Sequence, residues 1–438
     1  MKKKISEMPI EKVYIVVLAV LGFLYMIFMP PFRVSDEYRH FNRAYEVTMG
    51  QIVSQNESPR GSEVLAEGET KYSTVWNNRD INMQENRSKM ENTVASGYSP
   101  VSYLPASIGI FVARFFSENL LILVYVARIC SFICTLLILY KTVKYMPFGK
   151  NIIIAITLLP ISIQEFVTVS SDSLVIALTL AMISFTFYER QQVIEQPGAH
   201  MTWQEIVTMF AMAIMLGQCK YIYVFLSAIY LWIPKERFAG MKRKIWYAVT
   251  LVTATGMTMA IWLFATNVVK LGGSISQTAG TTDGSVNLFR VLAGTVSYNW
   301  KIFIASATAD SLGDLDIHPS KLLVVLFVLL LVYIILAESK NTKELTLPVR
   351  LSFLGLACLE IAALLFTFIH EGYVNEEFQA VIGIQGRYFI PMMAPVSMGI
   401  TLTNSRLQCP QISGKWLDVC MAVMNLPVIY AVYTACCG

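Results

Sequence analysis

Long apolar segments dominate this chain and constrain its fold more than any other feature. A helix that crosses the hydrocarbon layer of a membrane needs about 20 predominantly apolar residues, and somewhat shorter ones are tolerated. Only 15% of the 438 residues are charged, and the mean hydropathy is +0.54, which excludes a disordered chain, a coiled coil, a secreted disulfide scaffold and a nucleic-acid-binding protein. We therefore expect an all-α polytopic membrane protein. Its candidate spans are residues 13–30, 120–140, 151–169, 173–188, 202–217, 221–233, 246–268, 321–337, 351–370, 388–405 and 416–436.

The distribution of Lys and Arg predicts the topology. A twelfth apolar segment, 100–116, contains two prolines and two serines. If that segment lies on the outer surface, 18 basic residues fall on the side of the N-terminus, as the positive-inside rule requires. Those residues lie in 1–12, 141–150, at Arg190, and in 235–244, 340–350 and 406–415. We therefore expect eleven spans with the N-terminus inside and the C-terminus outside, and a juxtamembrane helix over 100–116.

This topology predicts one transmembrane domain over residues 1–438 with two large outer segments, 31–119 and 269–320. A smaller outer segment is 371–387, and no soluble domain is expected after the last span. In the first outer segment, Ser35 can cap a helix that runs to Gly50. Residues 51–97 are polar and read as a surface loop.

The start of the first outer segment carries residues suited to catalysis. Asp36, His40 and Arg43 are spaced to share one helix face, and Glu37 follows Asp36. A carboxylate in the first turn of a helix stays ionised, so Asp36 is a candidate general base. An amphipathic helix with solvated charge pairs would give the same pattern, with Tyr38, Phe41 and Tyr45 as an apolar stripe on the membrane.

Several other polar residues also fall at the outer ends of the predicted spans. Tyr98 and Tyr103 can line a groove or anchor the chain at the interface, and Arg128 lies inside the second span, where a charge needs a partner. Asp172 lies in a tight outer turn. Lys220 and Tyr221 lie in another such turn, where the lysine suits a lipid phosphate or serves as an anchor.

The last outer segment ends with Gln385, Arg387 and Tyr388. Arginine binds phosphate bidentately, so Arg387 suits a lipid phosphate, although simple snorkelling to the interface explains it as well. All of these charges converge near the outer headgroups. Glu360 is the clearest ionisable group near the midplane, where an ion-coupled transporter would place its site.

These motifs resemble a bacterial membrane family, domain of unknown function 2142, which is placed by similarity in the GT-C glycosyltransferase superfamily. The resemblance covers about 13–405. Its motifs are Asp36-Glu37 with His40-Phe41, Arg43-Ala44-Tyr45 and Gly50; Tyr98-Ser99-Pro100 with Tyr103 and Pro105; Ser171-Asp172; Lys220-Tyr221; and Gln385-Gly386-Arg387-Tyr388 with Pro391. Ala127-Arg128 also resembles the arginine that opens the second span in lipid-sugar transferases of the superfamily.

The resemblance implies an enzyme of the bacterial cytoplasmic membrane that takes a sugar from a polyprenyl-phosphate donor on the outer face. The acceptor would be a lipid-linked or cell-wall glycan, with membrane lipid as surroundings. The superfamily places an acidic catalytic residue in the first outer loop, so Asp36 is the expected base, with Glu37 beside it to position or pair. A divalent metal, Mg²⁺ or Mn²⁺, serves some members, but the ligands here do not require one.

From the residues, we expect Lys220, Arg387 and Arg128 to hold the departing phosphate. His40 and Arg43 would bind sugar or pair with carboxylates. A flippase or exporter of polyprenyl-linked glycans, and a non-catalytic regulator of polysaccharide assembly, are the alternatives.

Overall fold

The computed structural model describes residues 8–54, 70–84, 94–272, 288–338, 345–375, 379–401, 410 and 413–438. Most of this part of the chain is helical, as the apolar segments predict. Within these described ranges, seven helices are long and apolar enough to cross a membrane. They are α2 (Ile10–Phe28), α7 (Leu120–Tyr145), α10 (Ser171–Glu195), α12 (Met241–Gly272), α14 (Lys321–Glu338), α15 (Leu347–His370) and α17 (Gly414–Cys437). The chain is therefore a multi-pass membrane protein.

The segment expected as the third span is a broken helix. α8 (Lys150–Thr157) and α9 (Pro160–Val167) meet at 68°, and together they qualify as an eighth candidate span. Pro160 at the start of α9 explains the break, because proline cannot continue the helix before it. The bend brings Gln164 and Glu165 of α9 toward the end of the bundle where α10 begins.

Three further expected spans are shorter elements packed into the bundle. They are α11 (Trp203–Cys219), the 3₁₀ helix η3 (Tyr221–Trp232), and the pair η5 (Gly386–Phe389) and α16 (Ile390–Ile400). The expected juxtamembrane helix is present as η2 (Pro100–Tyr103) and α6 (Leu104–Arg114), and α6 packs against α7 and against α3 (Glu37–Thr48). An 11-residue helix is too short to span a membrane.

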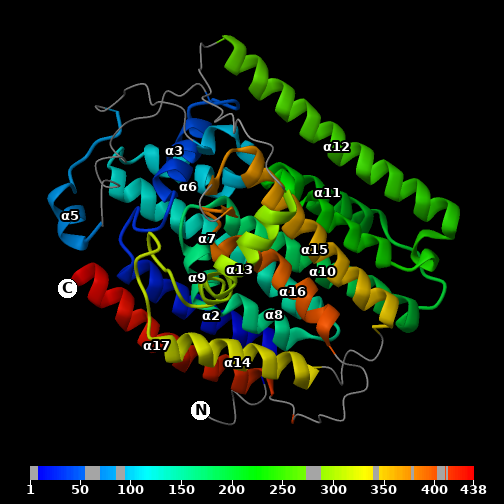
Figure 1. The fold of residues 1–438 in the computed structure, drawn as a ribbon. Coiled ribbons are helices and arrows are strands. Elements are labelled where there is room, and N and C mark those ends of the chain that lie inside the picture. The colour runs from blue at the N-terminus through cyan, green and yellow to red at the C-terminus, as the bar shows by residue number, and fades with distance from the viewer. Residues whose placement is uncertain are drawn as a thin grey trace.

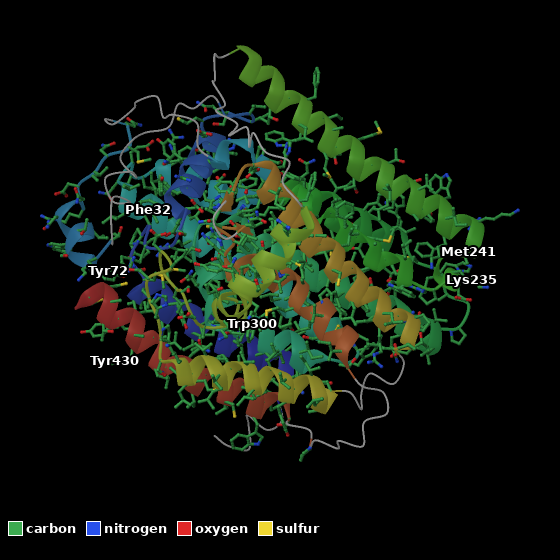
Figure 2. All side chains as sticks on the ribbon, in the orientation of Figure 1. Phe32, Tyr72, Lys235, Met241, Trp300 and Tyr430 are labelled. Carbon is green, nitrogen blue, oxygen red and sulfur yellow. The ribbon has the colours of Figure 1, made fainter. Side chains whose placement is uncertain are left out.

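The central helix of the bundle is α10. In its most apolar stretch 83% of the residues are buried, against 11% in α12. Figure 1 shows α12 along one edge of the molecule, and α14 and α17 along another. Lys235 and Met241 lie at the opposite end of the bundle from Phe32 and Tyr72 (Figure 2). The large core cluster lies among α2, α8, α9, α10 and α17.

The segment 269–320, which is expected on the outer face, contains a helix that the sequence analysis did not predict. α13 (Leu288–Ser306) runs through it and packs against η5 and the short hairpin of β1 (Val374–Asn375) and β2 (Ala380–Val381). The remaining elements are α5 (Tyr72–Asn77), η1 (Val94–Gly97) and η4 (Lys235–Phe238). Residues 307–320 follow α13 as a compact turn and pack against the segment before α3.

Candidate functional site

The segment before α3 places Asp36 in an unusual backbone conformation. Asp36 is the N-cap of α3 with φ of 65°, a left-handed conformation that aspartate tolerates better than most residues. Ser35 is therefore not the cap that its sequence position predicted. Its hydroxyl bonds Asp314, and its backbone N–H donates to the Gly313 carbonyl. The 307–320 turn thus holds the residue next to Asp36 in place.

The Asp36 carboxylate lies between two arginines. Its Oδ2 is 3.0 Å from Arg387 Nη2, and its Oδ1 is 3.3 Å from Arg39 Nη1. The side chain of Asp36 stays 36% exposed, whereas that of Arg387 is 4% exposed. The buried guanidinium of Arg387 thus holds the Asp36 carboxylate in place, while that carboxylate remains partly exposed.

Arg387 reaches Asp36 because Gly386 lets the chain pass very close to α13. A Cβ at Gly386 would lie 2.1 Å from the Ser306 carbonyl carbon. The guanidinium then meets two more carboxylates, with Nε 3.5 Å from Asp172 Oδ2 and Nη1 3.7 Å from Glu165 Oε1. Burial alone would lower the pKa of Arg387, but Glu165, Asp172 and Asp36 raise it well above its ordinary value. Arg387 therefore stays charged.

Lys220 completes this set of charges. It ends α11, and its ammonium forms a buried ion pair with Asp172, which lies in the first turn of α10. The ammonium also lies 4.8 Å from the Tyr388 ring centroid and 6.0 Å from that of Tyr98, within cation–π range. Burial works against the charge, but Asp172 raises the pKa of Lys220, so the lysine is cationic. We call Asp36, Glu165, Asp172, Lys220 and Arg387 the charge cluster.

A cavity of about 250 Å³ opens over this cluster. Its walls come from α3, η3, α15 and η5 and from residues beside them, including Tyr98 after η1 and Lys220 after α11. Of the residues predicted from sequence, six line it: Asp36, Tyr98, Lys220, Tyr221, Gln385 and Tyr388. Arg387 and Asp172 lie behind this wall and contact the cavity through Asp36 and Lys220. The structure thus brings eight predicted residues, from five distant segments, to one place.

His40 lies against the cluster but is enclosed. Its Nδ1 is 2.6 Å from the Tyr103 hydroxyl, and its ring stacks on Tyr98. Burial lowers the pKa of His40 to about 4, with Asp36 opposing the shift and Lys220 and Arg387 adding to it. His40 is therefore neutral at pH 7. Tyr103 is 1% exposed and packs against α3, and it does not line the cavity. The expectation that Tyr103 lines a groove is therefore not met at this cavity.

Glu37 and Arg128 form a separate buried pair and are not at the cavity. Arg128 donates from Nε and Nη2 to the Glu37 carboxylate at 2.7 and 2.5 Å, and from Nη1 to the Met29 carbonyl at 2.8 Å. The carboxylate also accepts from the backbone N–H groups of Phe32 and Val169. The left-handed turn at Asp36 directs Glu37 inward. Glu37 thus pairs, which is one of the two roles expected from sequence, and it links segments of the chain through Arg128. Arg128 lies away from the cavity, where the phosphate was expected.

Arg43 pairs with a carboxylate, which is one of the two roles expected from sequence, and its partner is Glu46, whose Oε2 is 3.2 Å from Arg43 Nη1. Arg43 is 1% exposed, and its guanidinium donates to the Tyr98 carbonyl at 3.3 Å and to the Gln51 and Ile52 carbonyls. These hydrogen bonds connect Tyr98, which follows η1, to the chain after α3. Phe41 and Tyr45 are fully buried against α6 and α7, so the predicted membrane-facing stripe is wrong for these two residues.

The sequence analysis does not identify three residues that the structure places at the site. Arg39 and Glu371 line the cavity, and Glu165 lies in the charge cluster with no exposed surface. Arg39 follows Asp36 by three residues on α3, a spacing that predicts an ion pair. Glu165 stands in an otherwise apolar segment, where a buried acid needs a partner, and that signal could have found it.

Within the described ranges, no group of three or more His, Cys, Asp or Glu side chains could hold a metal ion. The three carboxylates of the charge cluster instead face the cations of Lys220 and Arg387.

The family of this chain follows from one comparison. A family model described as "Predicted membrane protein (DUF2142)" matches residues 19–396. The chain belongs to this family. Neither the curated proteins nor the solved structures contain a significant match to it. The DUF2142 match includes every residue of the charge cluster, from Asp36 to Arg387, and ends within α16, before α17.

Proposed function

We propose that this DUF2142 protein is a glycosyltransferase of the bacterial cytoplasmic membrane that uses a polyprenyl-phosphate-linked sugar. The observation that carries the proposal is Asp36, a carboxylate oriented by Arg387 and open to a cavity that also contains the Lys220 ammonium. We further propose the GT-C type of fold, with eleven spans, the N-terminus inside and the cavity on the outer face.

The proposed reaction transfers the sugar with inversion at its anomeric carbon. The Asp36 carboxylate takes the proton of an acceptor hydroxyl, whose oxygen attacks the anomeric carbon. A new glycosidic bond forms, and the bond from that carbon to the phosphate oxygen breaks. The phosphate leaves with the electron pair, so it needs no carboxylic acid to protonate it, unlike most glycoside hydrolyses. The acceptor would be a lipid-linked or cell-wall glycan.

The cations at the cavity would stabilise the leaving phosphate. Lys220 and Arg39 both line the cavity, and fixed charges that face a developing negative charge lower the barrier. Arg387 lies behind Asp36, so its first role would be to orient the base. A phosphate that attracts Arg39 would also free the Asp36 oxygen that Arg39 contacts at 3.3 Å. Tyr98, Tyr221 and Tyr388 offer ring faces to the sugar or lipid.

The test compares Asp36→Asn with the wild type in lipid nanodiscs. Short-chain polyprenyl-phosphate sugars and a crude lipid-linked acceptor extract are added, and release of free polyprenyl phosphate is measured. Loss of a general base typically costs about 10²–10⁴-fold in rate, so release should fall by that factor while expression stays normal. The matched control is Asp80→Asn, which makes the same change at a side chain 87% exposed.

Two results would contradict the proposal. Release that Asp36→Asn leaves unchanged would remove Asp36 from the mechanism. No release with any donor, together with donor binding that survives Asp36→Asn, would favour a flippase or exporter of polyprenyl-linked glycans, or a regulator of polysaccharide assembly.

A further inference from the structure

A second, apolar hollow lies between α11, η3 and α12. This groove has a volume of about 360 Å³. One face of α12 forms its wall, with lining residues three or four apart from Lys244 to Met259. Ala228 of η3 and Met209 of α11 stand across from it. Figure 1 shows α12 running along the edge of the molecule beside α11. Only 11% of the most apolar stretch of α12 is buried, which is typical of a helix that faces lipid.

The groove and the cavity over the charge cluster are neighbours, because a third hollow shares lining residues with each of them. This small hollow lies between them, and Tyr98 and Tyr221 line both this hollow and the cavity. Met259 lines both the hollow and the groove. Trp262 Nε1 donates to the Gly97 carbonyl at 2.9 Å and bridges α12 to η1 beside the hollow. A single row of hollows thus leads from the Lys220 ammonium to the apolar wall of α12.

The groove exists because small side chains occur where the helices meet. A Cβ at Gly256 would meet nothing within 4 Å, so this glycine leaves open space in the groove. At Gly217, by contrast, a Cβ would lie 3.1 Å from Met259 Sδ and from Thr255 Cγ2. The absence of a side chain at Gly217 therefore allows α11 and α12 to approach one another at the small hollow. The absence of a side chain at Gly256 leaves space in the groove.

The length of the row indicates what kind of chain fits. From Lys244 to Trp262 is 262 − 244 = 18 residues, or about 27 Å of helix at about 1.5 Å per residue. The hydrocarbon core of a membrane is about 30 Å thick, so an ordinary acyl chain reaches only about half of it. A chain that fills the whole row must be longer than one leaflet is deep, as a polyisoprenoid is.

We propose that the groove between α11, η3 and α12 holds the polyisoprenoid chain of a lipid whose phosphate lies at Lys220. The inference rests on the proposed function for the phosphate, but it concerns binding and does not require transfer. α12 forms the outer wall of this chain site, and the hollow at Gly217 is the passage between the chain and its phosphate.

The test uses a polyprenyl phosphate that carries a diazirine in the middle of its chain. The protein in nanodiscs is irradiated with this probe, and the labelled peptides are mapped by mass spectrometry. Labels on α12 and η3 are the expected result. Gly256→Leu should reduce this labelling by about tenfold, equivalent to about 1.4 kcal/mol. The matched control is Gly355→Leu on α15, where a Cβ also meets open space but lies outside the groove.

Further results of the labelling experiment decide whether the proposal holds. Labels confined to other helices would overturn it, as would labelling that Gly256→Leu leaves unchanged. Displacement of the probe by an ordinary phospholipid as readily as by unlabelled polyprenyl phosphate would also overturn it. Ala248→Leu fills the same groove and serves if Gly256→Leu folds poorly. Asp36→Asn should still be labelled, so the chain site can stand even if transfer is never detected.

Discussion

Replacing Glu37 with Gln should reduce the stability of the protein, because this carboxylate is the counter-ion of a fully buried arginine. The side chains of Arg128 and Glu37 are 0% and 1% exposed. The two carboxylate oxygens together accept two hydrogen bonds from Arg128 and one each from the N–H groups of Phe32 and Val169. Glutamine offers one oxygen to these four donors, and its amide N–H groups face donors instead of acceptors.

The expected loss of stability follows from the ion pair and the hydrogen bonds that the Glu37 carboxylate makes. Removing one partner of a buried ion pair typically costs about 3–5 kcal/mol, because the remaining charge is left without compensation. A backbone N–H left without an acceptor adds about 1–3 kcal/mol, which local relaxation reduces. We therefore expect Glu37→Gln to lose at least about 3 kcal/mol of stability. Glu195→Gln, an exposed control on α10, should change stability by less than about 0.5 kcal/mol.

The assay is thermal stability of the detergent-solubilised protein, read as the monodisperse fraction that survives heating. The double variant Glu37→Gln with Arg128→Met contains no uncompensated charge, so its loss should be smaller than the sum of the two single losses. A Glu37→Gln protein of normal stability with lost transfer would refute this reasoning. It would give Glu37 a direct part in the reaction instead of the pairing role expected from sequence.

Two other predictions concern the surroundings of the charge cluster. Gly386→Ala should reduce the yield of folded protein and, in what folds, release of polyprenyl phosphate, because a Cβ 2.1 Å from Ser306 must displace Arg387; normal release would contradict this. Because the pKa of His40 falls to about 4 in the folded protein, the unfolded chain binds an extra proton between about pH 4 and 6.5. Stability should thus be full above pH 6.5 and fall by about 3 kcal/mol toward pH 4, at 1.36 kcal/mol per pKa unit. In melting curves against pH, His40→Gln should flatten this slope, and an unchanged slope would assign it to other groups.

The ends of the apolar segments predicted much of the candidate site. Asp36, Lys220 and Gln385 lie in different parts of the chain, yet each comes where an apolar run ends on the same predicted side. Because helix ends on one side of a bundle meet at one surface, their convergence could be predicted without any contact information. The prediction of a helix that stops near Gly50 is also confirmed, with α3 ending at Thr48 and Gly50 at φ of 82°.

The orientation of single side chains could not be predicted in this way. Helical spacing placed His40 and Arg43 on the face of Asp36, but Asp36 precedes the helix with a left-handed backbone, so the three do not share a face. Glu165 is not among the predicted site residues, because the sequence analysis takes residues 151–169 as one continuous span and does not predict the break at Pro160. The number of spans depends on the same kind of break, since η3 and α16 are helices of only 12 and 11 residues within longer apolar segments.

The break between α8 and α9 has a consequence for which part of the chain can fold by itself. The Leu158 carbonyl, freed at the bend, accepts a hydrogen bond from Asn425 Nδ2 of α17 at 3.0 Å, and Asn425 Oδ1 accepts one from Tyr25 at 2.9 Å. The match to the family ends at residue 396, before α17 begins. The cooperative unit is therefore longer than the recognised family segment, and a fragment cut at that boundary would expose an unpaired carbonyl inside its own core.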